Sequence, residues 1–139
     1  FCCIIIYLRF LKFMTSKFTL QIAAMSGAIS VVIGAFGAHG LQDLLIENGR
    51  LEVFETAVKY QFYHSLALLL VGSLMQSNES KFLIWSAKLF AFGILVFSGS
   101  LYVLSVTNYA ILGAITPIGG VFFIVGWLAL FRFANRVQS

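Results

Sequence analysis

Apolar residues are grouped in long blocks along this chain, and short polar or charged stretches separate the blocks. Residues 18–41 and 60–78 carry no formal charge when their histidines are neutral, and residues 89–131 carry none. A helix needs about 20 apolar residues to cross a bilayer, so the last block is too long for one crossing. A polar cluster, Thr107-Asn108-Tyr109, divides it. The pattern predicts an all-α fold, a single transmembrane four-helix bundle over residues 14–139, with spans near residues 18–41, 60–77, 83–106 and 110–131.

The stretch between the first two spans holds four of the five acidic residues. Asn48-Gly49 is a turn signal, and Leu41, Leu44 and Leu45 indicate a short helical piece before it. After the turn, apolar residues recur at helical spacing. We therefore expect an amphipathic helical segment that runs along the membrane interface before the second span enters the bilayer.

Composition places the chain in a membrane rather than in water. Hydrophobic residues make up 60% of it and charged residues 10%, with a mean hydropathy of +0.98. Soluble domains carry about 25% charged residues. The net charge of +4 does not indicate nucleic-acid binding, because the basic residues are scattered between apolar blocks. Both cysteines, Cys2 and Cys3, are adjacent, which indicates neither a disulfide framework nor a metal site.

The positions of the basic residues predict the orientation. Cytoplasmic loops of membrane proteins are enriched in Lys and Arg. An internal N-terminus places seven basic residues inside and only Arg50 and Lys59 outside. We therefore expect a multi-pass protein of the cell (inner) membrane with both termini in the cytoplasm. The seven inner residues are Arg9, Lys12, Lys17, Lys81, Lys88, Arg132 and Arg136.

Residues 1–13 do not fit the four-span pattern. Met14 opens a plausible translation start, so we interpret residues 1–13 as an upstream extension, with a short interfacial amphipathic segment as the alternative. Two further positions carry local expectations. Lys88 lies inside the third span and is expected to extend toward the headgroups, and Pro117 is expected to kink or loosen the fourth helix.

Small residues recur every four positions along the first span, at Ser26, Ser30, Gly34 and Ala38. Residues at this spacing share one face of a helix. Small side chains allow a second membrane helix to approach closely. We therefore predict that this ridge packs against another helix.

Four ordered motifs resemble those of a known family. They are GAFGAHGL at residues 34–41, FETAVKYQFYH at 54–64, FSGSLY at 97–102, and TPIGG at 116–120 with GW at 126–127. Together they resemble the YgdD family of small membrane proteins, domain of unknown function 423, which also contains the eukaryotic transmembrane protein 256. The resemblance covers about residues 14–131. It implies a four-helix integral membrane protein and carries over no activity.

One candidate polar cluster stands out among the predicted spans: His39, His64, Gln61 and Tyr60. The predicted topology places both histidines near the outer face, with Glu52 and Glu55 on the same side. Histidine is a proton carrier and a common metal ligand, so a Zn²⁺ site or proton relay is one interpretation. The other is that these groups form hydrogen bonds between helices. No metal-binding spacing and no nucleophile–base pair is present in the sequence.

These observations predict a structural or accessory membrane protein. We expect no enzyme activity and no cofactor. The expected contacts are the lipid bilayer and either a second copy of the chain or another membrane protein. The alternative is a small oligomeric transporter or channel subunit that uses the His/Gln/Glu polar site at the outer face.

Overall fold

The computed structural model describes residues 14–137, and every regular element within that range is helical. Three continuous segments are long and apolar enough to cross a membrane: Ser16–His39, Lys81–Thr107 and Ile111–Arg136. The elements are α2 (Ser16–His39), α3 (Gln42–Glu47), α4 (Leu51–Ser77), α5 (Lys81–Gly93), the π-helix η1 (Ile94–Ser98), α6 (Gly99–Thr107) and α7 (Ile111–Val137).

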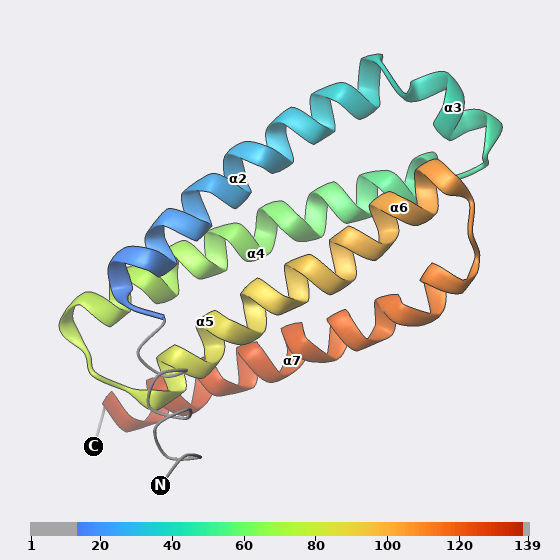
Figure 1. The fold of residues 1–139 in the computed structure, drawn as a ribbon. Coiled ribbons are helices and arrows are strands. Elements are labelled where there is room, and N and C mark those ends of the chain that lie inside the picture. The colour runs from blue at the N-terminus through green and yellow to red at the C-terminus, as the bar shows by residue number, and fades with distance from the viewer. Residues whose placement is uncertain (1–13, 138–139) are drawn as a thin grey trace, which may run out of the picture.

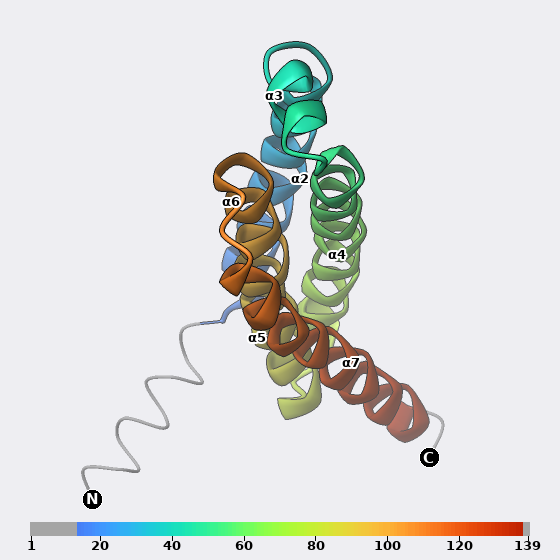
Figure 2. The same ribbon diagram turned by 90° about the vertical axis from the view of Figure 1, so that its right-hand side faces the viewer.

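The long helices lie side by side, and neighbours in the chain run in opposite directions (Figure 1). Helices α5, η1 and α6 form one continuous rod. The most extensive contacts join α2 to α4 and α5 to α7. A quarter turn of the view shows α2 and α7 on opposite sides of the molecule (Figure 2).

The α2–α4 pair is built on small residues. Gly27 faces the Cβ of Ser65, Gly34 faces a methyl group of Val58, and Gly37 lies directly against the Phe54 ring. A side chain at Gly37 would overlap that ring, so the close approach needs glycine there. The contacts advance in antiparallel register along the two helices.

The α5–α7 pair has an interlocking pattern of aromatic rings and glycines. The Phe123 ring covers Gly93, and the Phe90 ring covers Gly126. Gly119 lies against the backbone of Phe97, so that a Cβ added to it would be 2.7 Å from the Phe97 Cα. Each ring therefore fills the space that a glycine on the partner helix leaves open.

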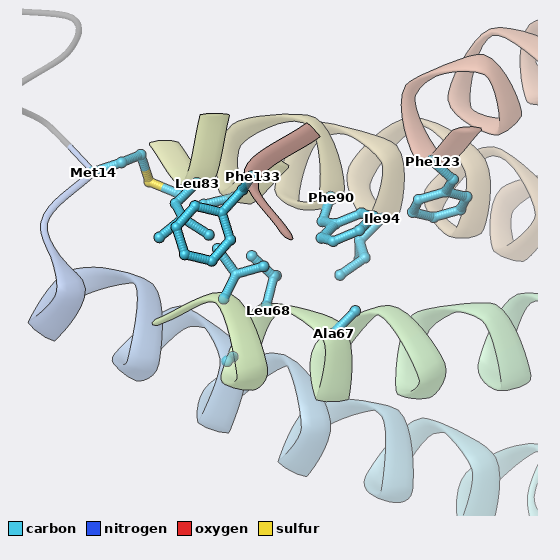
Figure 3. Packing of buried hydrophobic residues seen from close by; sticks show 11 residues of the cluster. Met14, Ala67, Leu68, Leu83, Phe90, Ile94, Phe123 and Phe133 are labelled. Atoms are coloured by element: carbon cyan, nitrogen blue, oxygen red, sulfur yellow. The ribbon is translucent and has the colours of Figure 1, made fainter. Parts of the chain in front are cut away.

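The largest buried cluster extends along α5 (Figure 3). Leu68, Leu83 and Phe90 are fully buried in it. Its labelled members come from α4, α5, η1 and α7 and from Met14, which precedes α2: Met14, Ala67, Leu68, Leu83, Phe90, Ile94, Phe123 and Phe133.

The predicted turns are present. Gly49 has a φ of +64°, a left-handed conformation that glycine adopts readily, directly after α3. The Asn48 side chain donates to the carbonyls of Ser105 (3.0 Å) and Val106 (3.1 Å), and Arg50 donates to the Asn108 side chain (3.0 Å). These bonds join the α3 loop to the end of α6.

One local expectation, the start of the second long helix, differs from the structure. The helix that contains residues 60–77 begins at Leu51, as one continuous helix rather than a separate interfacial segment, and it is not among the three candidate spans. Pro117 lies inside α7, which is one helix from Ile111 to Val137, and the expected kink stays a prediction. Lys88 is 4% exposed, and its ammonium lies 5.7 Å from the centroid of the Trp85 ring, one turn nearer the start of α5. Its expected reach to the headgroups also stays a prediction. The predicted segment 1–13 lies outside the described residues.

Candidate functional site

Gln61 joins three helices from the middle of α4. Its Nε2 donates to the carbonyl of Ser26 in α2 (3.0 Å), and its Oε1 accepts from the Tyr102 hydroxyl in α6 (2.8 Å). Ser65, one turn further along α4, donates to the Ser26 hydroxyl at 2.8 Å. Gln61 is 5% exposed, so these bonds are made away from water.

The partners of Gln61 fix the orientation of its amide group. A backbone carbonyl can only accept a hydrogen bond, so the nitrogen must face Ser26. The Tyr102 hydroxyl then donates to the amide oxygen. This leaves one amide N–H of Gln61 outside the two bonds, because a side-chain amide nitrogen carries two hydrogens.

His64, one turn after Gln61, points toward α5 and α7 and is enclosed by aromatic rings. Its imidazole stacks on Phe123 with centroids 3.5 Å apart, and Phe90 lies at 5.6 Å. Tyr60 and Trp127 complete what we call the aromatic cage, at 5.9 and 6.3 Å. The ring of His64 therefore packs as part of the core between α4, α5 and α7, with 7% of the residue exposed.

The hydrogen bonds of His64 specify a neutral ring. Its Nδ1 is 2.8 Å from the carbonyl oxygen of Tyr60, which accepts, so Nδ1 carries the hydrogen. The indole N–H of Trp127 donates to Nε2 at 3.4 Å, so Nε2 has none. Both ring nitrogens are thus used by the fold. A metal ion at Nε2 would have to replace the bond from Trp127.

Tyr60 belongs to the surface of the cage. Its ring stacks on Phe97 at 4.6 Å, and the residue is 40% exposed. It contributes its backbone carbonyl to His64 rather than its hydroxyl. Two of the four predicted cluster members, Tyr60 and His64, are thus in contact, whereas Gln61 points toward α2 and α6.

His39 is not brought next to His64. It is the last residue of α2 and is exposed. In the α2–α4 register, Ser65 lies beside Gly27, 12 residues before His39. At 1.5 Å per residue the two histidines are therefore about 18 Å apart along the helix axes. His64 lies at mid-helix, so the expected pair of histidines near the outer face is not formed.

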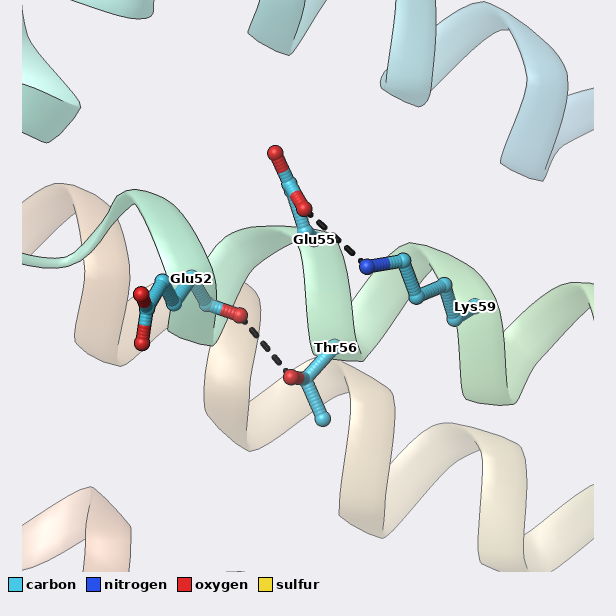
Figure 4. A network of polar contacts seen from close by, with 4 residues as sticks. All are labelled: Glu52, Glu55, Thr56 and Lys59. Atoms are coloured by element: carbon cyan, nitrogen blue, oxygen red, sulfur yellow. Dashed lines mark hydrogen bonds and ion pairs between the residues drawn. The ribbon is translucent and has the colours of Figure 1, made fainter.

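The acidic residues Glu52 and Glu55, expected on the same side of the membrane as the histidines, lie at the start of α4 (Figure 4). Glu55 and Lys59 form an exposed ion pair of 3.0 Å, and the Glu52 carbonyl accepts from the Thr56 hydroxyl. Within residues 14–137, no three His, Cys, Asp or Glu side chains are grouped so as to hold a metal ion.

The predicted small-residue ridge lies mostly on the α4 side of α2. Ser26 bonds to Gln61 and Ser65, Ser30 is fully buried, and Gly34 contacts Val58. Ala38 is exposed, and the neighbouring Gly37 is the glycine buried against α4. Near the end of α2 the contact face thus falls one residue earlier than predicted, at Gly37 instead of Ala38. The reason is that 3.6 residues per turn do not match a strict spacing of four.

Sequence reasoning did not select Tyr102, Phe123 or Trp127 as site residues. Tyr102 and Trp127 stand inside the motifs at residues 97–102 and 126–127, so those motifs were the available signal. Nothing in the spacing of residues indicates which distant helices will face Gln61 and His64.

Comparison with known proteins gives a consistent family. The family described as "Protein of unknown function (DUF423)" matches residues 33–120. A UPF0382 membrane protein of Staphylococcus epidermidis is 48% identical over 114 residues, 82% of this chain and 92% of the relative. The UPF0382 inner membrane protein YgdD of Escherichia coli K12 is 40% identical over 127 residues, 90% of this chain and 95% of the relative. No solved structure matches the chain.

These relatives confirm two predictions made from the sequence. The resemblance to the YgdD family is correct, since the matches cover most of the chain. The placement in the inner membrane as a multi-pass protein is also confirmed, by the names of the relatives and by the three helices able to span a bilayer. The chain belongs to the DUF423 (UPF0382) family of membrane proteins.

Proposed function

We propose that α4 is a fourth membrane crossing and that both termini lie in the cytoplasm. Helix α2 ends and α5 begins at opposite ends of the molecule (Figure 1), and α4 is the 27-residue helix between them. If α2 and α5 both lie in the bilayer, the chain must return through it along α4. The polar residues that lower the hydropathy of α4, including Gln61, His64 and Ser65, bond to the protein rather than face lipid.

The charge distribution supports this orientation. Lys17, Lys81, Arg132 and Arg136 lie near one end of the long helices, whereas Arg50, Lys59 and four acids lie near the other. Fusions of green fluorescent protein and of alkaline phosphatase test the topology. We expect fluorescence from a fusion at the C-terminus and phosphatase activity from one at Gly49. The reverse result would overturn the orientation, and equal signals at both sites would overturn the crossing by α4.

We further propose that the protein is a non-enzymatic accessory component of the membrane, which packs against lipid and a protein partner or second copy. One observation carries this: several polar side chains within the helices, Gln61 and His64 among them, bond to residues of neighbouring helices. Besides Gln61 and His64, the buried hydroxyls of Ser100 and Thr116 bond to each other across α6 and α7 at 2.8 Å. Large apolar side chains meanwhile cover the outside of the helices, such as Val32, Phe36 and Ile124.

The partner is tested by photo-crosslinking in native membranes. A photoreactive amino acid at Val32, on the exposed side of α2, should give a discrete adduct with protein, whereas one at buried Leu68 should not. Mild-detergent extraction should yield a particle larger than the single chain. A strictly monomeric particle together with lipid adducts alone at Val32 would exclude a protein partner.

The transporter alternative has less support. A proton or ion path needs polar groups that continue to both faces of the membrane, and His64 is surrounded by the aromatic cage. Proteoliposome flux that falls when His64 and His39 are both changed to Ala would favour the transporter over the accessory role.

A further inference from the structure

A lateral cavity of ≈ 430 Å³ lies beside Gln61, between α2 and the α5–η1–α6 rod. Its walls are apolar, with Met25 and Ile29 of α2 on one side and Leu95 and Gly99 on the other. Met25 and Leu95 are 63% and 69% exposed, so the opening faces the surroundings of the helices. A molecule dissolved in the bilayer can therefore enter from the side.

The polar atoms of this cavity lie deep in the membrane. Its lining includes Gln61 and its two hydrogen-bond partners, Ser26 and Tyr102. Ser26 follows Ser16, the first residue of α2, by 10 residues, or about 15 Å at 1.5 Å per residue. The hydrocarbon core is about 30 Å thick. The polar group at the cavity is thus near the midplane, far from the lipid headgroups.

The amide of Gln61, which lines the cavity, retains a hydrogen-bond donor. The amide of Gln61 uses one N–H for the Ser26 carbonyl, and its oxygen accepts from Tyr102. The second N–H remains for a ligand. A bond accepted by the amide oxygen strengthens the amide as a donor, because hydrogen bonds in a chain polarise one another.

The depth of the donor selects the class of ligand. The ester carbonyls of a phospholipid are held at the headgroup level by the charged end of the molecule, so they do not reach the midplane. The partner of Gln61 must be an uncharged lipid that carries its acceptor into the hydrocarbon core. Prenyl quinones have this chemistry: a ring with carbonyl acceptors, an apolar tail and no charge.

We propose that the cavity binds a prenyl quinone, with a ring carbonyl accepting from Gln61 and the tail leaving between Met25 and Leu95. The volume is within the roughly 300–1,000 Å³ typical of ligand sites. The wall contains η1, whose Ile94 and Leu95 line the cavity, and π-helical turns occur frequently at functional sites. This binding goes beyond the accessory role and does not depend on a protein partner.

The test uses the full-length protein in phosphatidylcholine nanodiscs. The probe is a ubiquinone analogue with two isoprene units, and native mass spectrometry measures the bound fraction. The comparison ligand is a benzene ring with the same prenyl tail, which lacks both carbonyls. We expect saturable binding of one quinone per chain. The comparison ligand should bind about five- to tenfold more weakly, the effect of one hydrogen bond.

Three variants separate the contributions. Gln61→Leu removes the donor and should weaken quinone binding about five- to tenfold. Gly99→Leu should abolish binding, because Gly99 lines the cavity and an added Cβ there meets no atom within 4 Å. Ala28→Leu adds the same bulk on the exposed face of α2, outside the cavity lining, and should bind as the unchanged protein does.

The results of these experiments can either support or overturn quinone binding in the cavity. Circular dichroism first checks that each variant keeps its helix content, and Gly99→Leu still tests the site if Gln61→Leu does not fold. Absence of saturable binding would overturn the proposal. So would equal binding of the quinone and the carbonyl-free ligand, which would make the cavity a place for any apolar chain. Undiminished binding by Gly99→Leu would place the quinone elsewhere.

Discussion

Two neighbouring faces of α4 place buried polar side chains in different surroundings. On the side toward α5 and α7, His64 is enclosed by rings, and both of its nitrogens are bonded to the protein. On the side toward α2 and α6, Gln61 is held by two bonds but borders a cavity that opens laterally.

This difference comes from how the neighbouring helices pack. Helix α7 approaches α5 closely because glycines receive aromatic rings, and those rings also fill the space around His64. Helix α2 packs its small residues on α4, so that its bulkier Met25 and Ile29 point sideways and leave a gap before η1 and α6. A polar group in filled surroundings stabilises the fold, whereas one beside a gap is available to a ligand. The variants below test this distinction.

The largest effect is expected at Gly119, on the filled side. Gly119→Ala should reduce the free energy of unfolding by at least about 3 kcal/mol, because the added Cβ would overlap the backbone of Phe97, which cannot move aside as a side chain can. SDS-induced unfolding in mixed micelles measures this. Gly120→Ala is the control: its Cβ would meet the Phe97 ring at an ordinary 3.9 Å. Equal stability of the two variants would contradict the close η1–α7 contact.

The second-largest loss of stability is expected at His64. His64→Ala should reduce the free energy of unfolding by about 2–4 kcal/mol, because it empties the aromatic cage and leaves the indole N–H of Trp127 without its acceptor. The same unfolding assay serves as the measurement. His39→Ala, at the exposed end of α2, should change stability by less than about 0.5 kcal/mol. A similar loss in both variants would argue against a structural role specific to His64.

A smaller change is expected on the open side. Gln61→Leu removes two bonds between helices, each worth about 0.6 kcal/mol in membrane proteins. The expected loss of stability is therefore about 1 kcal/mol, and Tyr102→Phe, which removes one of these bonds, should lose about half as much. If Gln61→Leu destabilised the protein as much as His64→Ala, the two sides of α4 would not differ in the way proposed.

The smallest effect is expected outside both regions, at the Glu55–Lys59 ion pair. Both side chains are more than half exposed, so Glu55→Gln should change the free energy of unfolding by no more than about 0.5 kcal/mol. Repeating the measurement at high salt should leave the difference near zero, because exposed charges are screened. A loss above 1 kcal/mol would show that this end of α4 is buried by a partner.

Much of the helical framework could be predicted from the sequence. The uncharged blocks located α2 and α7, and the turns at Asn48-Gly49 and Thr107-Asn108-Tyr109 separated the right elements. The second uncharged block, residues 60–78, was harder to interpret as a membrane span. Gln61 and His64 lower its hydropathy, and only the structure shows that their bonds to Ser26, Tyr60 and Tyr102 offset that cost.

The candidate site was predicted only in part. Tyr60 and His64 share a helix face, as their spacing of four predicted, and they are in contact. The pairing of His39 with His64 failed, because the chain order of two antiparallel helices does not reveal their register. That register is set by the glycine contacts of α2, such as Gly37 with Phe54.

The sequence by itself determined that the chain lies in a membrane as helices, because hydropathy and charge spacing act locally along the chain. It also determined the turns, through residues such as Gly49 whose conformational freedom is intrinsic. Only the tertiary structure decided which polar side chains are enclosed and which border a cavity. That outcome depends on how closely distant helices approach, and a glycine in one helix allows a close approach only where it faces another helix.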